Sequence, residues 1–275
     1  MRISLLQTNI QWADPMANMQ AVGSALLACQ GSDMCVLPEM WPTGFCPQPS
    51  CLPAHNQQQV LTWLQERADA MDCAIVGSMA TLTDGGRWTN RLHFIRPHME
   101  PLFYDKRHLF TYGGEHLHYS PGEHRLVVEW RGVRFMPLVC YDLRFPLWSR
   151  NHLGCPDIPD TQAVLEDKAG EGCTEPRALY DVLLYVASWP APRALAWQSL
   201  LVARAIENQC YVCGVNRVGQ DPTCQYCGGT AFIDPYGVRQ EEVPMNETGL
   251  LSVHLDMESL NAFREKFPVL RDRDL

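Results

Sequence analysis

The feature that most constrains the fold is a series of short apolar segments that recur along most of the chain. We interpret them as β-strands, at residues 3–10, 33–37, 73–80, 133–140, 181–188 and 210–218. Several are apolar at successive positions rather than at alternate ones, which is typical of strands with both faces covered. Protein layers must therefore lie on both sides of a sheet, as in an α/β architecture.

Segments with helical periodicity separate these strands. Three of them are predicted helices, at residues 15–29, 56–70 and 192–209. Three shorter segments are expected to pair as antiparallel strands, at residues 88–95, 101–104 and 126–130. This order of elements predicts a single domain over residues 1–275, and a 46% hydrophobic content is sufficient for one large core.

Residues 151–176 interrupt the pattern, because they are polar, acidic and rich in proline and glycine. A segment of this length without periodicity is usually a functional or a surface loop. We interpret it as a surface insertion in the domain. A lid over a nearby site is the alternative, since the segment follows shortly after Cys140.

Charge and hydropathy restrict the partners. A formal net charge of −9 argues against nucleic acid or an anionic membrane surface. No apolar run reaches the roughly 18–20 residues of a membrane span, and the first residues, MRISLLQTNIQW, do not resemble a cleaved signal peptide. We therefore expect a cytoplasmic protein whose 12 cysteines stay reduced.

Cys140 differs from the other cysteines in its position at the end of the apolar segment 133–140, before Tyr-Asp-Leu-Arg. Where a strand ends and a predicted helix begins, a side chain is exposed and the first N–H groups are free, as at the sites of open α/β sheets. The N–H of Tyr141 would then be an oxyanion donor. A thiol is a nucleophile only beside a base or a cation, and a buried structural cysteine is the alternative.

Two other segments offer such partners. In DMCVLPEMWPTGF, Glu39 follows an apolar strand and stands near Trp41 and Phe45, which would partly desolvate it, as suits a general base. In LFYDKRHLF, Lys106 stands among aromatic and aliphatic residues. Taken alone, Glu39 is better interpreted as a helix-capping or solvated carboxylate and Lys106 as an ordinary surface lysine, so the prediction depends on their combination.

The three segments together resemble the nitrilase superfamily of carbon-nitrogen hydrolases, through LPE at 37–39, YDKRHLF at 104–110 and CYDLRFP at 140–146. Further stretches resemble its bacterial YafV-like omega-amidases: WPTGF, GGEHLHYSPGE, YVASWPAPRALAWQSLLVARAIENQCYV and FREKFP. The resemblance covers nearly the whole chain apart from residues 151–176. It implies a four-layer α-β-β-α sandwich, a cofactor-free and metal-free hydrolase, and a homodimer.

The resemblance also assigns catalytic roles. Cys140 would be the nucleophile, Glu39 the base that takes its proton, and Lys106 with the Tyr141 N–H the group that holds the oxyanion. Each such donor is worth roughly 2.7–4 kcal/mol in the barrier.

The segment GGEHLHYSPGE supplies a second glutamate, as in many members of the superfamily. Glu115 occupies the matching place and would position groups or relay protons, and Glu123 is the competing candidate. His116 and His118 are interpreted as local hydrogen-bonding residues that border the site at most.

Omega-amidases cleave the terminal amide of 2-oxo acid monoamides such as 2-oxoglutaramate and 2-oxosuccinamate, so the resemblance implies a small-molecule substrate with a carboxylate. Arg144 and Arg193 are candidates to bind that carboxylate, and Phe45 and Trp189 would form apolar walls. Arg144 is equally a candidate for a structural pair with Asp142. Other small amides, nitriles or carbamoyl compounds are alternative substrates, and a non-catalytic binding protein is the alternative class.

Two CxxC pairs suggest a different function. Cys210 and Cys213 are separated from Cys224 and Cys227 by 10 residues, which suggests a tetrathiolate zinc site or a redox pair. However, Cys210 and Cys213 belong to a predicted strand, where positions i and i+3 point to opposite faces. The gap is also shorter than the roughly 15–20 residues of common zinc sites. We therefore expect these cysteines to be packing residues.

Overall fold

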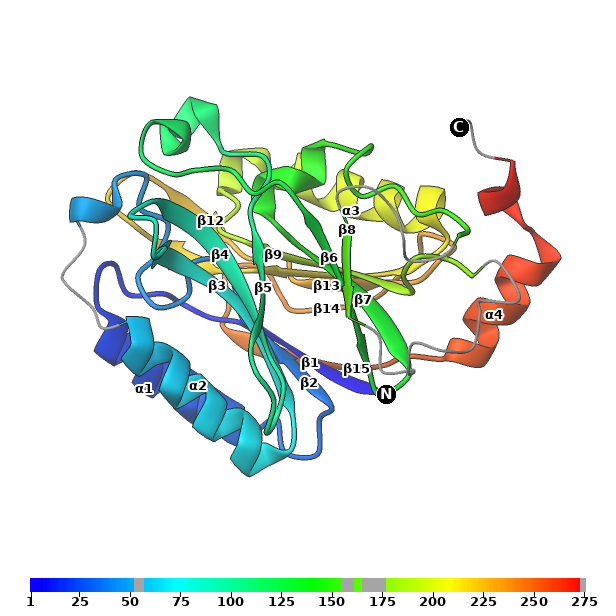
Figure 1. Cartoon of the computed structure of the whole chain (residues 1–275), viewed down its shortest axis with the longest axis horizontal. Coiled ribbons are helices and arrows are strands. Elements are labelled where there is room, and N and C mark those ends of the chain that lie inside the picture. Colours follow the sequence, from blue (N-terminus) through cyan, green and yellow to red (C-terminus); the bar gives the residue numbers. More distant parts are fainter. Residues whose placement is uncertain (52–56, 155–160, 165–176, 273–275) are drawn as a thin grey trace.

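Two β-sheets stacked face to face form the centre of the molecule, as the computed structural model shows (Figure 1). The structure describes residues 1–51, 57–154, 161–164 and 177–272. The first sheet contains β1 (Arg2–Gln7), β2 (Met34–Val36), β3 (Ala74–Leu82), β4 (Trp88–Ile95), β5 (Leu102–Asp105) and β15 (Gly249–His254), in the order β15-β1-β2-β3-β4-β5.

The second sheet has the order β14-β13-β10-β9-β7-β6-β8. Its strands are β6 (Arg125–Trp130), β7 (Val133–Val139), β8 (Thr161–Val164), β9 (Val182–Ala187), β10 (Tyr211–Asn216), β13 (Ala231–Ile233) and β14 (Arg239–Glu242). A separate two-stranded ribbon pairs β11 (Val218–Gln220) with β12 (Gln225–Cys227).

Helices cover the outer faces of the two sheets. In Figure 1, α1 (Pro15–Leu27) and α2 (Gln57–Met71) lie together on the outer side of the first sheet, and α3 (Ala194–Asn208) lies on the outer side of the second. The fourth helix, α4 (Met257–Lys266), lies at one end of the molecule near the C-terminus. The predicted four-layer α-β-β-α sandwich is confirmed. None of the described helices is long and apolar enough to cross a membrane.

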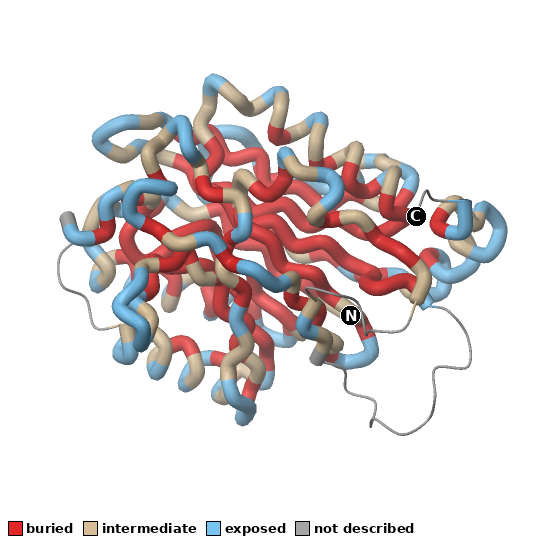
Figure 2. Tube along the Cα trace, turned by 45° about the horizontal axis from the view of Figure 1, so that its top comes forward, coloured by how far each residue is buried: buried red, intermediate tan, exposed pale blue. Residues whose placement is uncertain are grey.

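Strand β2 shows why its sequence is apolar at successive positions. Met34 and Val36 belong to the core between the two sheets, whereas Cys35 belongs to the core between the first sheet and its helices. Burying an aliphatic side chain of this size stabilises the fold by about 1.5–3 kcal/mol. The buried strands at the centre of Figure 2 follow from this two-sided packing.

Particular residues fix where helix α1 begins and how closely helix α3 packs on its sheet. Helix α1 begins at the Asp14 cap, whose carboxylate accepts from the Ala17 N–H, and helix α3 packs against β10. At that contact a Cβ on Gly214 would lie only 2.6 Å from Leu201 and 2.9 Å from Trp197, so the close approach of helix and strand requires glycine.

The parallel strands bring the ends of several segments together. Strands β7, β9 and β10 are parallel neighbours in the second sheet, and β1, β2 and β3 are parallel neighbours in the first. Residues that follow β2, β7 and β9 therefore meet at one end of the sandwich, which is where open α/β sheets build their sites.

The structure corrects three details of the prediction. The segment after Cys140 is a 3-10 helix, η4 (Cys140–Arg144), and not the start of an α-helix. Strand β8 lies inside the predicted insertion 151–176 and pairs in parallel with β6. Most of that segment lies outside the described residues, including the part that would form a lid. Finally, the prediction omitted every regular element after β11, namely the short strands β12, β13 and β14, the longer strand β15 and the polar helix α4.

Candidate active site

Cys140 occupies a sharp turn between β7 and η4. Its φ angle is +46°, in the left-handed region that side chains other than glycine rarely adopt. Such a conformation costs about 1–3 kcal/mol and persists only where surrounding contacts enforce it, often at functional sites. Cys140 is partly accessible, and the first N–H groups of η4, including that of Tyr141, have no partner within the helix.

The contacts that hold this turn come from Asp142. One carboxylate oxygen accepts from the Val139 N–H at 3.1 Å and from the Tyr104 hydroxyl at 2.8 Å. The other accepts from the His108 N–H at 2.9 Å and lies 2.9 Å from His108 Nδ1. Since Tyr104 belongs to the first sheet and Asp142 follows the second, Asp142 connects the two sheets beside the cysteine.

Glu39 follows β2 and is completely buried. Its Oε1 accepts from Lys106 Nζ at 2.9 Å and from Asn90 Nδ2 at 2.8 Å. Its Oε2 accepts from the backbone N–H of Ser188, just after β9, at 2.8 Å. The carboxylate is therefore held by both sheets.

Lys106 stands between two glutamates. Its Nζ lies 2.9 Å from Glu39 Oε1 and 2.9 Å from Glu115 Oε2, and all three side chains are at most 1% exposed. Glu115 also accepts from the Phe110 N–H at 2.6 Å and from Asn90 Nδ2 at 3.0 Å. A buried ion cluster of this kind is stable only when its charges are hydrogen-bonded.

The groups around the thiol determine its ionisation. Burial raises the pKa of Cys140 well above its ordinary value, the negative charge of Glu39 raises it further, and Lys106 opposes both effects. The carboxylate of Glu39, as a nearby acceptor, thus favours the protonated thiol. Cys140 is a neutral thiol close to the carboxylate of Glu39.

The charges of Lys106 and Glu115 depend on each other. Burial alone lowers the pKa of Lys106, but the negative charges of Glu115 and Glu39 outweigh it and raise the pKa above its ordinary value. Burial raises the pKa of Glu115, Lys106 lowers it, and the charge of Glu39 raises it again, with an increase as the net result. The ammonium is therefore firmly protonated.

Aromatic rings and two arginines surround this cluster. The Phe110 ring packs against Phe45 at 6.4 Å and against Tyr141 at 5.2 Å between centroids. The Arg193 guanidinium lies 5.3 Å from the Phe110 ring centroid, and that of Arg144 lies 5.0 Å from the Trp189 ring.

Arg144 is exposed, and the structural pair that we considered between Arg144 and Asp142 is absent, because Asp142 is engaged by Tyr104 and His108. Within the described part of the chain, no hydrogen bond or ion pair occupies either the Arg144 or the Arg193 guanidinium.

The competing glutamate, Glu123, and the two histidines next to Glu115 lie outside the buried cluster. Glu123, His116 and His118 are exposed, whereas Glu115 is completely buried against Lys106.

Sequence reasoning missed Asn90 and the positioning role of Asp142. The sequence carries no signal for Asn90, because a single asparagine in an alternating strand is unremarkable until the fold places it against Glu39 and Glu115.

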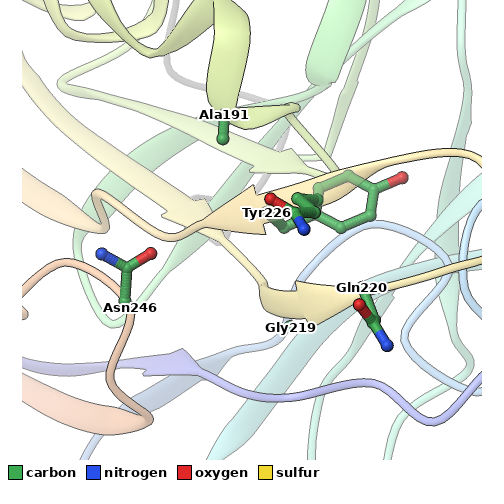
Figure 3. A pocket seen from close by; sticks show the side chains of 6 residues that line it. Ala191, Gly219, Gln220, Tyr226 and Asn246 are labelled. Carbon is green, nitrogen blue, oxygen red and sulfur yellow. The ribbon is translucent and has the colours of Figure 1, made fainter.

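A separate hollow of about 280 Å³ lies beside the β11–β12 ribbon (Figure 3). It is lined by Ala191, Gly219, Gln220, Gln225, Tyr226 and Asn246. Figure 3 shows that Ala191 enters it from the segment after β9, whereas the other side chains come from the ribbon and the loop before β15. None of the acidic, basic or thiol groups described above lines this hollow.

The CxxC pairs occupy two different environments. Cys210 and Cys213 are completely buried in the hydrophobic core, and burial raises the pKa of both thiols. Cys224 precedes β12 in the ribbon, and Cys227 is the last residue of that strand. In the part of the chain that the structure describes, no three His, Cys, Asp or Glu side chains are grouped so as to hold a metal ion.

Comparisons with known proteins define the class. The sequence model of the carbon-nitrogen hydrolase family matches residues 2–154 and 178–265. The chain therefore belongs to the carbon-nitrogen hydrolase family, and the predicted membership of the nitrilase superfamily is confirmed.

Particular relatives cover the whole chain. It is 42% identical to omega-amidase YafV of Escherichia coli (strain K12) over 275 residues, which is 100% of this chain and 97% of that protein. It is 31% identical to 2-oxoglutaramate amidase of Bacillus subtilis (strain 168) over 273 residues, or 98% of this chain and 96% of that protein. The crystal structure of XC1258 from Xanthomonas campestris, a CN-hydrolase superfamily protein with an arsenic adduct in its active site, gives a TM-score of 0.86 at 36% identity, over 100% of this chain and 97% of that one. The predicted enzyme class, a hydrolase of carbon–nitrogen bonds, is confirmed.

Proposed function

We propose that this protein is an omega-amidase, which hydrolyses the terminal amide of a small 2-oxo acid monoamide such as 2-oxoglutaramate or 2-oxosuccinamate to the acid and ammonia. The observation that carries the proposal is the buried cluster of Glu39, Lys106 and Glu115 beside the thiol of Cys140. The 42% identity to an omega-amidase over 100% of this chain supports the substrate class.

In the first half of the reaction, Cys140 Sγ attacks the amide carbon while Glu39 accepts the thiol proton. The carbon–sulfur bond forms and negative charge moves to the amide oxygen. The Tyr141 N–H and Lys106 stabilise this oxyanion, and Lys106 has three N–H donors for its two carboxylate partners and the substrate. Glu39 then gives its proton to the amide nitrogen, the carbon–nitrogen bond breaks, and ammonia leaves a thioester on Cys140.

In the second half, Glu39 accepts a proton from water as the water oxygen attacks the thioester carbon. The same donors hold the second oxyanion. The carbon–sulfur bond breaks, the proton returns to Cys140, and the acid leaves. Glu39 therefore acts as base and acid in turn, for which its fixed contacts to Ser188 and Lys106 are suited.

Arg144 and Arg193 are proposed to bind the substrate carboxylate. Their guanidiniums stack on Trp189 and Phe110, which leaves their N–H groups available for a planar anion. Phe45 and Trp189 would border the carbon chain of the substrate. Glu115 is proposed to hold Lys106 in place rather than to touch the substrate.

The proposal is tested by ammonia release from 2-oxoglutaramate, 2-oxosuccinamate, glutamine and asparagine, with the Cys140→Ala variant as the zero-rate control. We expect kcat/KM to be at least tenfold higher for the oxo acids, which corresponds to about 1.4 kcal/mol. A preference for the amino acids would contradict the omega-amidase assignment. Absence of ammonia release from every amide, nitrile and carbamoyl compound would contradict the hydrolase mechanism itself.

Three further properties stay predictions. The gap in the family match between residues 154 and 178 supports one domain with an insertion at about 151–176. A cytoplasmic location stays a prediction, and it agrees with the nine cysteines that the structure shows as free thiols. A homodimer is expected from the resemblance, and the highly exposed Leu147 and Leu195 are apolar residues that such an interface could cover.

A further inference from the structure

Asn90 on β4 contacts every charged member of the buried cluster. Its Nδ2 donates to Glu39 Oε1 at 2.8 Å and to Glu115 Oε1 at 3.0 Å. Its backbone carbonyl accepts from the Lys106 N–H at 3.0 Å. Asn90 is itself completely buried, so these contacts are not shared with solvent.

The carboxamide has only one orientation that suits this environment. The two N–H bonds of one amide nitrogen diverge, so each can serve a different carboxylate. The reversed orientation would place the carboxamide oxygen against two acceptors. In the observed orientation Asn90 Oδ1 is buried and has no hydrogen-bond partner among the described residues. An unpaired buried acceptor is unfavourable for stability, and its presence at a site requires an explanation.

The charge balance of the cluster supplies that explanation. Two carboxylates face one ammonium, so one negative charge has no cationic partner. Asn90 donates a hydrogen bond to each carboxylate without adding a charge, which favours the ionised form of both. An additional lysine or arginine would lower the basicity of Glu39 more strongly, and an additional acid would repel both carboxylates.

We propose that Asn90 is a positioning residue of the amide-hydrolysis reaction, which holds Glu39 and Glu115 in their ionised forms on either side of Lys106. It acts through these residues and does not contact the substrate. The inference rests on the proposed roles of Glu39 and Lys106 in ammonia release.

The test compares the pH dependence of kcat/KM for the parent and for Asn90→Ala. Loss of a donor to the ionised carboxylates makes their charged form less favourable, because hydrogen bonds to the charged form stabilise it. We therefore expect the acidic limb of the profile to move to higher pH, with kcat at neutral pH lowered by about 10- to 100-fold. KM should change by less than threefold, because Asn90 does not touch the substrate.

Asn90→Asp is the second variant and also decides the question if Asn90→Ala does not fold. Its carboxyl group can donate only when it is protonated and repels Glu39 and Glu115 when it is ionised. We expect its activity relative to the parent to be greatest at low pH and to fall as the pH rises. This direction is opposite to that of Asn90→Ala.

Asn208→Ala is the matched control, because Asn208 is also completely buried and donates to a backbone carbonyl, but at the far end of α3. It should lose thermal stability and keep the parent pH profile. If Asn90→Ala or Asn90→Asp also loses only stability, with an unshifted profile and kcat within threefold, the inference is wrong. If the parent releases no ammonia from any amide, the proposed function fails instead.

Discussion

Cys140 and Cys35 stand in two buried clusters that differ in one respect. Cys140 faces Glu39 and Lys106, whereas Cys35 faces two other thiols: its sulfur lies 3.6 Å from that of Cys73, and it shares a hydrogen bond with Cys29. The pKa of both cysteines is raised. For Cys35 the main causes are the hydrogen bonds to Cys29 and Cys73, followed by burial. For Cys140 they are burial and the charge of Glu39.

A raised thiol pKa therefore does not separate a nucleophile from a packing residue. The thiols around Cys35 offer neither a base nor a positive charge, and Cys35 is completely buried in a regular strand. Cys140 has Glu39 as the proposed acceptor of its proton, Lys106 as the proposed cation for the oxyanion, and a strained backbone at a partly accessible position. The surroundings of the thiol determine what it can do.

The largest expected effect comes from replacing each sulfur by oxygen. Cys140→Ser should lower kcat/KM for the best amide substrate by more than about a thousandfold, with thermal stability close to the parent. Cys35→Ser should keep the activity within about twofold and lower the free energy of unfolding by about 1–3 kcal/mol, because a hydroxyl replaces an apolar thiol in the core. Ammonia release and urea unfolding measure the two quantities. Loss of activity in a folded Cys35→Ser protein would remove the distinction.

The next effect comes from removing the cation. Lys106→Met keeps the length of the side chain and leaves Glu39 and Glu115 without a positive partner. We expect a loss of about 3–5 kcal/mol in the free energy of unfolding and a decrease of about 10²- to 10³-fold in kcat. The assay is run well below the melting temperature of the variant. Lys266→Met is the control, because Lys266 is exposed at the end of α4 and should affect neither quantity. Retention of full kcat by Lys106→Met would refute the role of Lys106.

The smallest effect is a pH dependence of stability. The pKa of Glu115 is raised in the folded protein, mainly by burial. The contribution of such a carboxyl to stability is fully present below its ordinary pKa of about 4.3. It is lost as the pH rises through the folded-state value.

The free energy of unfolding of the parent, relative to Glu115→Gln, should therefore decrease from pH 4.5 to pH 7.5. The decrease is about 1.4 kcal/mol for each unit by which the pKa is raised. Urea unfolding at several pH values measures this difference. A difference that is constant or increases with pH would show that Lys106 dominates the ionisation of Glu115.

The sequence predicted the layers and the three charged or thiol segments, and the reasons are local. Strands such as β2 have both faces buried, so their sequences are apolar at successive positions and can be recognised directly. The sequence could not predict the side-chain contacts of Asn90 or Asp142, because their partners, apart from Val139, lie 25 to 51 positions away in the chain. Asn90 and Glu39 are 51 positions apart in the sequence, and Tyr104 and Asp142 are 38 positions apart.

The helix predicted after Cys140 is a short 3-10 helix for a related reason. The hydrogen bonds of Asp142 to the Val139 N–H and to Tyr104 impose a tight 3-10 turn, and this constraint comes from the neighbouring sheet rather than from helix propensity. The strands β12, β13 and β14 were missed because each has only three or four residues. Such elements carry little periodicity of their own.

The link between Glu39 and Ser188 has a consequence for the order of folding. These residues are 149 positions apart, and their hydrogen bond joins the end of β2 to the end of β9 across the two sheets. Closing so long a loop is slow and depends on earlier, more local structure. A chain with either sheet formed alone therefore lacks this link. Under the proposed mechanism, activity towards amides requires both sheets to be docked, so partly folded chains are inactive.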